Sequence, residues 1–263
     1  MELQCEIYIP GSRMSYETYR IHLTRYIFAA KYVKEARVLD IACGSGYGSS
    51  YLIRKGAKSV IGVDMSEEAV NIAKANFQKP GLSFQVGTAE NLPFADKSFD
   101  VITSMGTIDH MSDPAAFLRH AQRVLRPGGY FISALQNREL ITPFPLRKNI
   151  DPFHKIEYAP MELGDLVSQY FNNVQAYGEN FRGTRIIQAR RIIYNIRKNK
   201  LKISDATAQR GLNLLTPFSK PKYIIYKEEQ IDSDLNGEWS LINSKKTSSK
   251  FLNYIVIGQK ELK

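Results

Sequence analysis

Apolar and polar positions along this chain follow two different periods. Short runs rich in β-branched residues predict strands, and apolar positions three and four residues apart predict helices between them. The predicted strands cover residues 37–41, 59–64, 82–86, 99–104, 129–135, 174–177 and 252–258. Because strands that alternate with helices form mostly parallel sheets, we predict an α/β fold with a mostly parallel seven-stranded sheet.

Helix signals support this alternation. The predicted helices cover residues 14–33, the stretch from the glycine-rich loop to Lys55, 66–76, 114–125 and 161–171. Ser66, followed by Glu67 and Glu68, has the composition of an N-cap and an acidic first turn. We therefore predict an N-terminal cap (1–36), a core (37–181), a basic helical or irregular insertion (182–250) and a final core strand (251–263).

Length and composition fit one domain with one sizeable elaboration, since the chain has 263 residues and 43% hydrophobic content. Its start has no basic and apolar leader pattern, and no apolar run is long enough to span a bilayer. We expect a cytoplasmic protein. Cys5 and Cys43 are its two cysteines, which excludes a disulfide framework.

The positive charge is local. Residues 182–227 contain twelve lysines and arginines and one acid, Asp205, which gives +11, whereas the whole chain carries +10. The rest of the chain therefore sums to about −1. We predict that this segment begins as a helix over 184–197.

A glycine-rich loop follows the first strand of the predicted sheet. In such sheets ligands bind at the carboxyl ends of the strands, and Gly44, Gly46 and Gly48 would let a ligand approach the backbone. Asp64 ends the second strand, where a carboxylate accepts hydrogen bonds from ribose hydroxyls. Asp40 would repel a pyrophosphate and attract a cation. These residues indicate a nucleoside-containing, cationic ligand.

Five ordered segments carry a resemblance to a known family. They are Val-Leu-Asp-Ile-Ala-Cys-Gly-Ser-Gly-Tyr-Gly (38–48), Val-Asp-Met-Ser (63–66), Gly-Thr-Ala-Glu-Asn-Leu-Pro-Phe (87–94), Phe-Asp-Val-Ile (99–102) and Val-Leu-Arg-Pro-Gly-Gly (124–129). The series resembles the motifs of class I S-adenosylmethionine-dependent methyltransferases, which have a Rossmann-like fold. The resemblance implies S-adenosyl-L-methionine as the cofactor and S-adenosyl-L-homocysteine as its product.

The resemblance also implies a cofactor site. Asp40, Ala42, Gly44 and Gly46 would hold the methionine part, Asp64 the ribose, Met65, Ala89 and Glu90 the adenine, and Ser104 belongs to the same set. Thr88 departs from the family pattern, in which many relatives have Asp, so a contact to the adenine amino group would be weaker or made by the hydroxyl.

Two flanking stretches resemble bacterial methyltransferases of capsule, lipopolysaccharide and glycan biosynthesis. They are residues 8–11 with 22–29, and residues 149–158 with 161–163. By this resemblance Arg25 would reach the cofactor carboxylate and Tyr26 would help to close the site. The alternative is that both side chains only pack the cap helix.

Histidines and an acid supply candidate chemistry for the acceptor. His110 follows the fourth strand and is our first candidate for a general base, with Asp109 orienting it or binding a substrate hydroxyl. His154, in the later linker, is a second candidate for proton abstraction or acceptor binding. In the alternative interpretation the Asp109 and His110 pair only shapes the pocket. We predict no metal site, with the approach of Asp109 to Glu90 as the one arrangement that would change this.

The basic segment has three interpretations. It forms a solvated face, it attracts an anionic acceptor, or it contacts nucleic acid or a membrane surface. Arg182, Arg185, Arg190 and Arg191 are the predicted phosphate contacts. Ser104-Met105-Gly106-Thr107 lacks the loop of exocyclic-amine methyltransferases, which disfavours nucleic acid.

We therefore predict an O-methyltransferase for a sugar or phosphate-bearing intermediate of surface-glycan biosynthesis, with an anionic small molecule or glycan as its partner. Methylation of a phosphate-type capsule substituent, of a small-molecule amine or of nucleic acid, and a non-catalytic binding module, remain alternatives. The sequence leaves the oligomeric state open.

Overall fold

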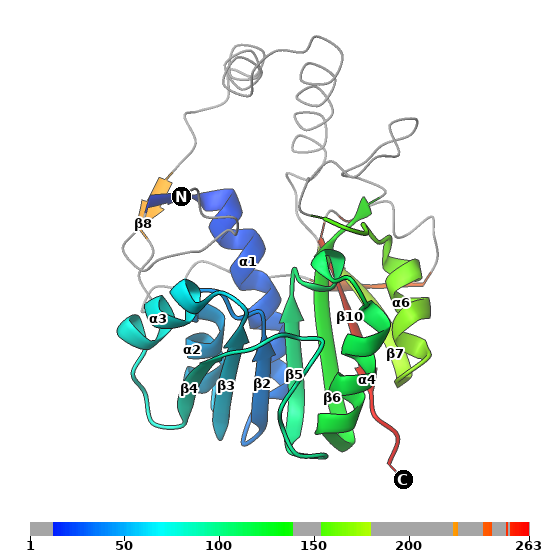
Figure 1. Ribbon diagram of the computed structural model, residues 1–263. Helices are drawn as coiled ribbons and strands as arrows, with labels where there is room; N and C mark the ends of the chain where they lie inside the picture. Colours follow the sequence, from blue (N-terminus) through cyan, green and yellow to red (C-terminus); the bar gives the residue numbers. More distant parts are fainter. Residues whose placement is uncertain are drawn as a thin grey trace, which may run out of the picture.

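The computed structural model describes residues 13–138, 154–179, 223–225, 239–243, 251 and 253–262. Its main feature is an eight-stranded sheet in the order β4-β3-β2-β5-β6-β10-β7-β9 (Figure 1). The strands are β2 (Arg37–Ile41), β3 (Ser59–Asp64), β4 (Leu82–Val86), β5 (Phe99–Met105), β6 (Leu125–Gln136), β7 (Asn172–Glu179), β9 (Trp239–Ile242) and β10 (Asn253–Gln259). Strands β4, β3, β2, β5 and β6 run parallel to one another, and β10 lies between β6 and β7 and is antiparallel to both.

This arrangement confirms the predicted fold class, but the predicted count of seven strands in the sheet was wrong by one. The eighth strand is β9, which pairs antiparallel with β7 at the edge of the sheet. It lies in the range 182–250, which we expected to be helical or irregular. Short edge strands depend on backbone pairing with a neighbour, so a four-residue run gives little signal in the sequence.

The sheet is covered by helices on both faces (Figure 1). The helices are α1 (Tyr16–Ala29), η1 (Ala30–Tyr32), α2 (Tyr47–Arg54), α3 (Glu67–Asn76), η2 (Ile108–His110), α4 (Pro114–Val124) and α6 (Pro160–Ser168). Val38 packs in the apolar cluster that contains residues of α1, α2 and α3, whereas Leu39 packs in the cluster that contains residues of α4 and α6. Successive residues of a strand point to opposite faces, so β2 is buried on both sides.

Local signals define several helix starts. The Ser66 side chain accepts a hydrogen bond from the backbone N–H of Ala69, at 3.2 Å, as the predicted N-cap requires. Asp113 accepts in the same way from Ala116 at 2.8 Å, and Pro114 occupies the first helical turn, where its missing N–H costs nothing. These caps fix the helices that follow β3 and β5.

A second, two-stranded sheet joins β1 (Arg13–Ser15) to β8 (Tyr223–Ile225) in antiparallel pairing. Thus both β8 and β9 fall within the predicted insertion, and β9 is part of the core sheet. The predicted helix over 184–197 lies outside the described residues. Within the described ranges, the structure has no helix with the length and apolar character needed to cross a membrane.

Candidate functional site

The candidate site lies at the carboxyl ends of β2, β3 and β5, where the order of the strands reverses direction from β2 to β5 (Figure 1). Asp64, the last residue of β3, joins two loops. Its Oδ2 accepts from the backbone N–H of Gly44 at 2.8 Å, and its Oδ1 accepts from that of Ser66 at 2.9 Å. Each carboxylate oxygen has a second lone pair for a ligand. Asp64 therefore both fixes the glycine-rich loop and presents acceptors beside it.

The three glycines of the loop have different roles. A Cβ on Gly44, at φ +54°, would have no neighbouring atom within 4 Å. In contrast, a Cβ on Gly46 would lie 2.7 Å from Phe84, and one on Gly48 would lie 2.0 Å from the ring of Tyr26. The absence of a side chain at Gly46 and Gly48 thus allows close packing inside the protein, and the contact of these two glycines with a ligand stays a prediction. Gly44 alone of the three faces open space.

Asp40 lies beneath this loop and is fully buried. Its carboxylate accepts hydrogen bonds from the hydroxyls of Ser49 at 2.6 Å, Thr103 at 2.7 Å and Tyr26 at 3.3 Å. Burial raises the pKa of Asp40 to about 6, although the three hydroxyl bonds oppose that rise. Through these three hydrogen bonds the carboxylate of Asp40 links α1, α2 and β5 beneath the glycine-rich loop.

The remaining residues that the sequence assigned to the cofactor site differ in their surroundings. Met65 is 78% exposed, and Ala42 has a left-handed φ of 56°, which is uncommon for a residue with a side chain. The side chain of Ala89 packs against the core, which leaves its backbone for any ligand contact. Glu90 accepts from the backbone N–H groups of residues 112 and 113, at 3.0 and 3.1 Å. Ser104 is buried in β5.

Helix α1 contributes Arg25 and Tyr26, and both are buried. The ring of Tyr26 packs against Gly48, and its hydroxyl donates to Asp40, so Tyr26 has a packing role in this structure. Nη1 of Arg25 lies 3.2 Å from the position that a Cβ on Gly106 would take, and its charge acts on Asp109. Arg25 thus extends from α1 to the loop after β5. Contact of Arg25 or Tyr26 with a cofactor stays a prediction.

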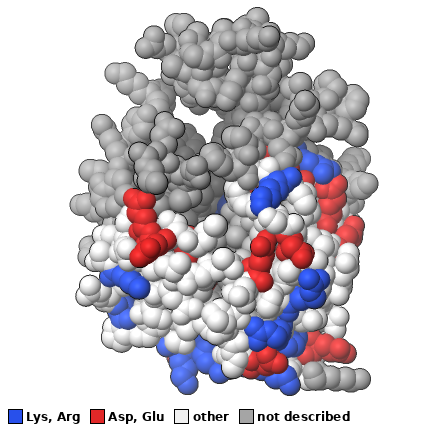
Figure 2. Space-filling model, in the orientation of Figure 1, with Lys and Arg blue, Asp and Glu red and all other residues white. Residues whose placement is uncertain are grey.

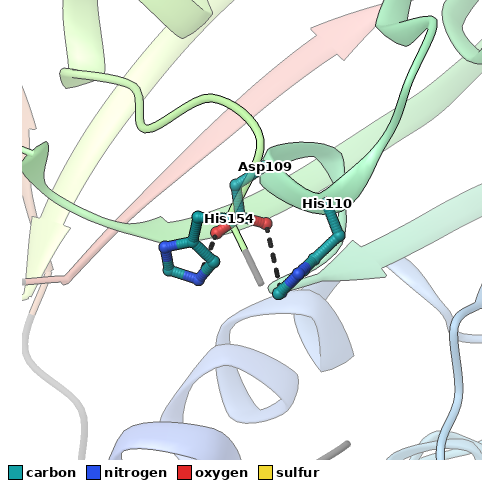
Figure 3. Close-up of side chains that lie close together, drawn as sticks. All are labelled: Asp109, His110 and His154. Carbon is teal, nitrogen blue, oxygen red and sulfur yellow. Dashed lines mark ion pairs between the residues drawn. The ribbon is translucent and has the colours of Figure 1, made fainter. Parts of the chain in front are cut away.

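A compact polar cluster follows β5. Asp109 lies between two imidazole rings, with Oδ2 3.3 Å from Nε2 of His154 and Oδ1 3.8 Å from Nε2 of His110 (Figure 3). The ring centroids of the two histidines are 4.7 Å apart. The side chain of His110 is 42% exposed, whereas those of Asp109 and His154 are 9% and 13% exposed. The structure therefore joins all three residues that the sequence nominated for the chemistry.

Backbone contacts hold the His154 segment over η2. The backbone N–H groups of Lys155 and Ile156 donate to the carbonyl of Asp109, at 2.8 and 3.1 Å. Nδ1 of His154 lies 3.4 Å from Oε1 of Glu157, whose side chain is 2% exposed. Sequence reasoning missed Glu157, although its spacing of three residues from His154 was a usable signal.

Burial dominates the electrostatics of this cluster. It raises the pKa of Asp109, while the charges of His110, His154 and Arg25 act in the opposite direction. Asp109 and Glu90 do not share a site here, because Glu90 is bonded to the backbone at the start of α4. The acid and the two histidines are thus the polar centre of the acceptor side.

Charge on the described surface is mixed. On the face in Figure 2, lysines and arginines are interspersed with acids among the described residues, as the near-zero balance outside 182–227 predicts. The predicted anion contacts Arg182, Arg185, Arg190 and Arg191 lie outside the described residues, and their role stays a prediction.

The glycine-rich loop, Asp64 and the polar cluster together fall within or beside a segment that matches a known family. Residues 39–133 match the family described as a methyltransferase domain. This segment of the chain is thus similar to methyltransferase domains, the family that the five motifs indicated.

Two curated proteins that are similar in sequence to this chain are also methyltransferases. A probable S-adenosylmethionine-dependent methyltransferase of Mycolicibacterium smegmatis is 36% identical over 160 residues, 60% of each chain. A ubiquinone biosynthesis O-methyltransferase of Parvibaculum lavamentivorans is 37% identical over 133 residues, 49% of this chain and 52% of that protein. The chain thus spans about half to 60% of the length of these relatives.

A solved structure supports the methyltransferase fold over nearly the whole chain. It is a methyltransferase of Thermotoga maritima, described as a possible histamine N-methyltransferase, with 22% identity and a TM-score of 0.59. The alignment covers 94% of this chain and 92% of that one.

The edge of the sheet fits the cofactor of this family. Gly44 leaves open space, Met65 offers an exposed apolar side chain, and Asp64 retains acceptor capacity. Among the described residues, nine buried polar side-chain atoms have no hydrogen-bond partner, and four of them belong to Arg25 or to the end of β5 and the loop after it: Ser104 Oγ, Thr107 Oγ1, Asp109 Oδ1 and Arg25 Nε. Because such atoms are costly when unpaired, they favour a polar ligand at this edge.

Proposed function

We propose that this protein transfers a methyl group from S-adenosylmethionine to a hydroxyl oxygen of an acceptor that carries phosphate, such as a sugar intermediate of surface-glycan biosynthesis. The observation that carries the proposal is the position of the cluster of Asp109, His110 and His154. It follows directly after β5, beside the edge that fits the cofactor. Methyl transfer to a hydroxyl is assisted by a group of this kind, which can take up the proton of the hydroxyl.

Positioning accounts for much of the chemistry. When bound, S-adenosylmethionine supplies an activated methyl group on a sulfonium, so alignment of the acceptor provides a large part of the rate. Asp64 would hold the ribose, and Met65 would pack on the adenine. Two observations support these roles: Asp64 bonds to the backbone of the glycine-rich loop, and the apolar side chain of Met65, next in the chain, is exposed.

His110 is assigned as the proton acceptor because its side chain is the most exposed of the three. A histidine can take up a proton near neutral pH. Asp109 would orient the ring of His110 and stabilise its charged form. His154, between the carboxylates of Asp109 and Glu157, would hold Asp109 in place.

The choice of a phosphate-bearing acceptor rests on the positive charge of residues 182–227. Twelve basic residues within 182–227 produce a strongly positive segment in a chain that is otherwise near neutral. A local field of this sign raises the encounter rate of anions, and arginines bind phosphate through paired hydrogen bonds. The flanking stretches that resemble enzymes of capsule and glycan biosynthesis support the same class.

A second candidate is a hydroxyl acceptor without phosphate. It is favoured by the Parvibaculum relative, which its name places in ubiquinone biosynthesis as an O-methyltransferase. The same polar cluster would serve this acceptor, and the basic segment would then have another role.

The test is methyl transfer from isotopically labelled S-adenosylmethionine to a panel of acceptors, read by mass spectrometry. The panel contains nucleotide-sugars, phosphorylated sugars, capsular oligosaccharides, a quinone precursor, a small-molecule amine and short RNA. We expect a methyl ether on a phosphorylated sugar compound, with KM raised by Arg185→Gln and Arg190→Gln. A product only on the quinone precursor, amine or RNA would overturn the phosphate-bearing class.

A further inference from the structure

Asp109, His110 and His154 form a group with the composition of a transition-metal site. Each residue offers one ligand atom, and the three atoms lie within 4.8 Å of one another. Two imidazoles and one carboxylate on one side of an ion, with the other positions open, is a recurrent arrangement for divalent metals. From this geometry we infer that the cluster binds a divalent cation of the zinc type.

Each histidine nitrogen lies at a distance from one oxygen of Asp109 that allows an ion between them. Atoms that each lie about 2.1 Å from a zinc ion are about 3–4 Å apart. Nε2 of His154 and Nε2 of His110 lie 3.3 and 3.8 Å from the two oxygens of Asp109. The second of these distances is too long for a direct hydrogen bond, whereas an ion between the two atoms would bond to both.

Asp109 supplies an independent observation. Its side chain is 9% exposed, and among the described residues its Oδ1 atom has no hydrogen-bond partner. This oxygen faces the ring of His110 (Figure 3). A buried carboxylate oxygen without a partner is costly, and a cation bound to it would remove that cost.

Glu157 occupies the place of a supporting carboxylate. Histidines that ligate a metal usually donate their other ring N–H to a carboxylate or carbonyl, which orients the ring. Oε1 of Glu157 lies 3.4 Å from Nδ1 of His154, and this leaves Nε2 directed at Asp109. The backbone bonds from Lys155 and Ile156 to the Asp109 carbonyl fix the segment that carries both residues.

The surrounding charges are compatible with a cation. Asp109 and Glu157 provide two acids, and Arg25 provides the positive charge that acts on Asp109. A bound ion would have open positions on the exposed side of His110. If the proposed function holds, the hydroxyl oxygen of the acceptor would occupy one of them and release its proton to solvent, and the role of His110 as proton acceptor would apply to the metal-free cluster. This last step rests on the proposed function, whereas binding of the ion does not.

The test uses the full chain after treatment with a chelator. Co²⁺ is added as the probe, because its absorption spectrum reports nitrogen and oxygen ligation, and Zn²⁺ competition gives the affinity. We expect a single Co²⁺ per chain, loss of the spectrum in His110→Ala and in His154→Ala, and an affinity about 10–100-fold lower in Glu157→Gln. His120→Gln, in α4, is the matched control and should keep the site.

Several outcomes separate this inference from the proposed function. Absence of a bound Co²⁺ in the wild-type protein would overturn the inference, and so would an unchanged spectrum in the His110 and His154 variants. Binding of S-adenosylhomocysteine by each variant shows that it is folded. Metal binding without methyl transfer would leave the inference standing and overturn the function. Methyl transfer without metal binding would overturn the inference and leave the proposed function standing.

Discussion

The ring of Tyr26 occupies the space into which a side chain at residue 48 would project, because a Cβ on Gly48 would lie 2.0 Å from its Cζ atom. The hydroxyl of the same ring donates to the buried carboxylate of Asp40. We expect Gly48→Ala to lower the free energy of unfolding by about 1–3 kcal/mol through overpacking. Urea unfolding of Gly48→Ala, Tyr26→Ala and the double variant tests this. If the two changes are additive, Tyr26 is not the obstacle.

Substitution of Gly44 should affect cofactor binding more than stability. Its φ is +54° and nothing lies near a Cβ there, so Gly44→Ala should cost only about 1–2 kcal/mol of stability through its backbone. Binding of S-adenosylmethionine should weaken well beyond this, because the added methyl faces the ligand. Gly56→Ala is the control, since Gly56 also has a positive φ, of +92°, and a Cβ there would meet only the side chain of Lys34, at 4.0 Å. Equal cofactor affinity in the two variants would contradict a ligand-facing Gly44.

Met65 should matter for binding and not for folding. Its side chain is 78% exposed, so Met65→Ala should change stability by less than about 0.5 kcal/mol. Loss of the apolar contact with the adenine should weaken cofactor binding by about fivefold, or about 1 kcal/mol. Calorimetric titration measures this. Leu262→Ala, which removes another exposed apolar side chain, at 82%, should leave the affinity unchanged.

Asp40 predicts a pH dependence of stability. Its folded pKa of about 6 exceeds its ordinary value of 3.8, so its contribution is fully present below about pH 4 and is lost as the pH rises through about 6. The loss amounts to about 3 kcal/mol. Asp40→Asn, which cannot ionise, should therefore gain stability relative to the wild type across this window. Urea unfolding at several pH values measures the difference, and a difference that stays constant with pH would contradict the raised pKa.

Asp109 should affect the rate more than cofactor binding. Asp109→Asn keeps the size of the side chain but removes the charge that lies beside both histidines. We expect kcat for methyl transfer to fall by about 10²–10⁴-fold, the usual contribution of general acid–base catalysis. The affinity for S-adenosylhomocysteine should remain close to that of the wild type. A variant with normal kcat would reduce the cluster to a structural role.

The sequence predicted the parts of this fold that depend on local pattern. Strands β2, β3 and β4 have the predicted bounds, and Ser66 caps its helix, because period and capping chemistry are local. The role of Gly48 was not predictable, since its neighbour Tyr26 comes from a helix 22 positions earlier in the chain. The extra strand β9 depends on its pairing with β7.

In the candidate site, too, the sequence indicated features that depend on local motifs but not contacts between distant residues. Motif spacing predicted that Asp64 and Met65 contact the cofactor; in the structure Asp64 bonds to the glycine-rich loop and Met65 is exposed, and their contact with a cofactor stays a prediction. The contact of His154 with Asp109 joins residues 45 positions apart and depends on how the linker folds back over η2. For this reason the sequence named both residues but did not indicate that they form one cluster with His110.

Binding of S-adenosylmethionine is the central claim, and calorimetric titration of the wild type and Asp64→Ala tests it most directly. We predict that the wild type binds one cofactor molecule and that Asp64→Ala binds at least about tenfold more weakly, because it loses the ribose acceptors and the bond to Gly44. Asp165→Ala, at an exposed position of α6, should bind like the wild type. A folded wild-type protein that gives no binding heat and no thermal stabilisation, or an Asp64→Ala variant with full affinity, would contradict the account.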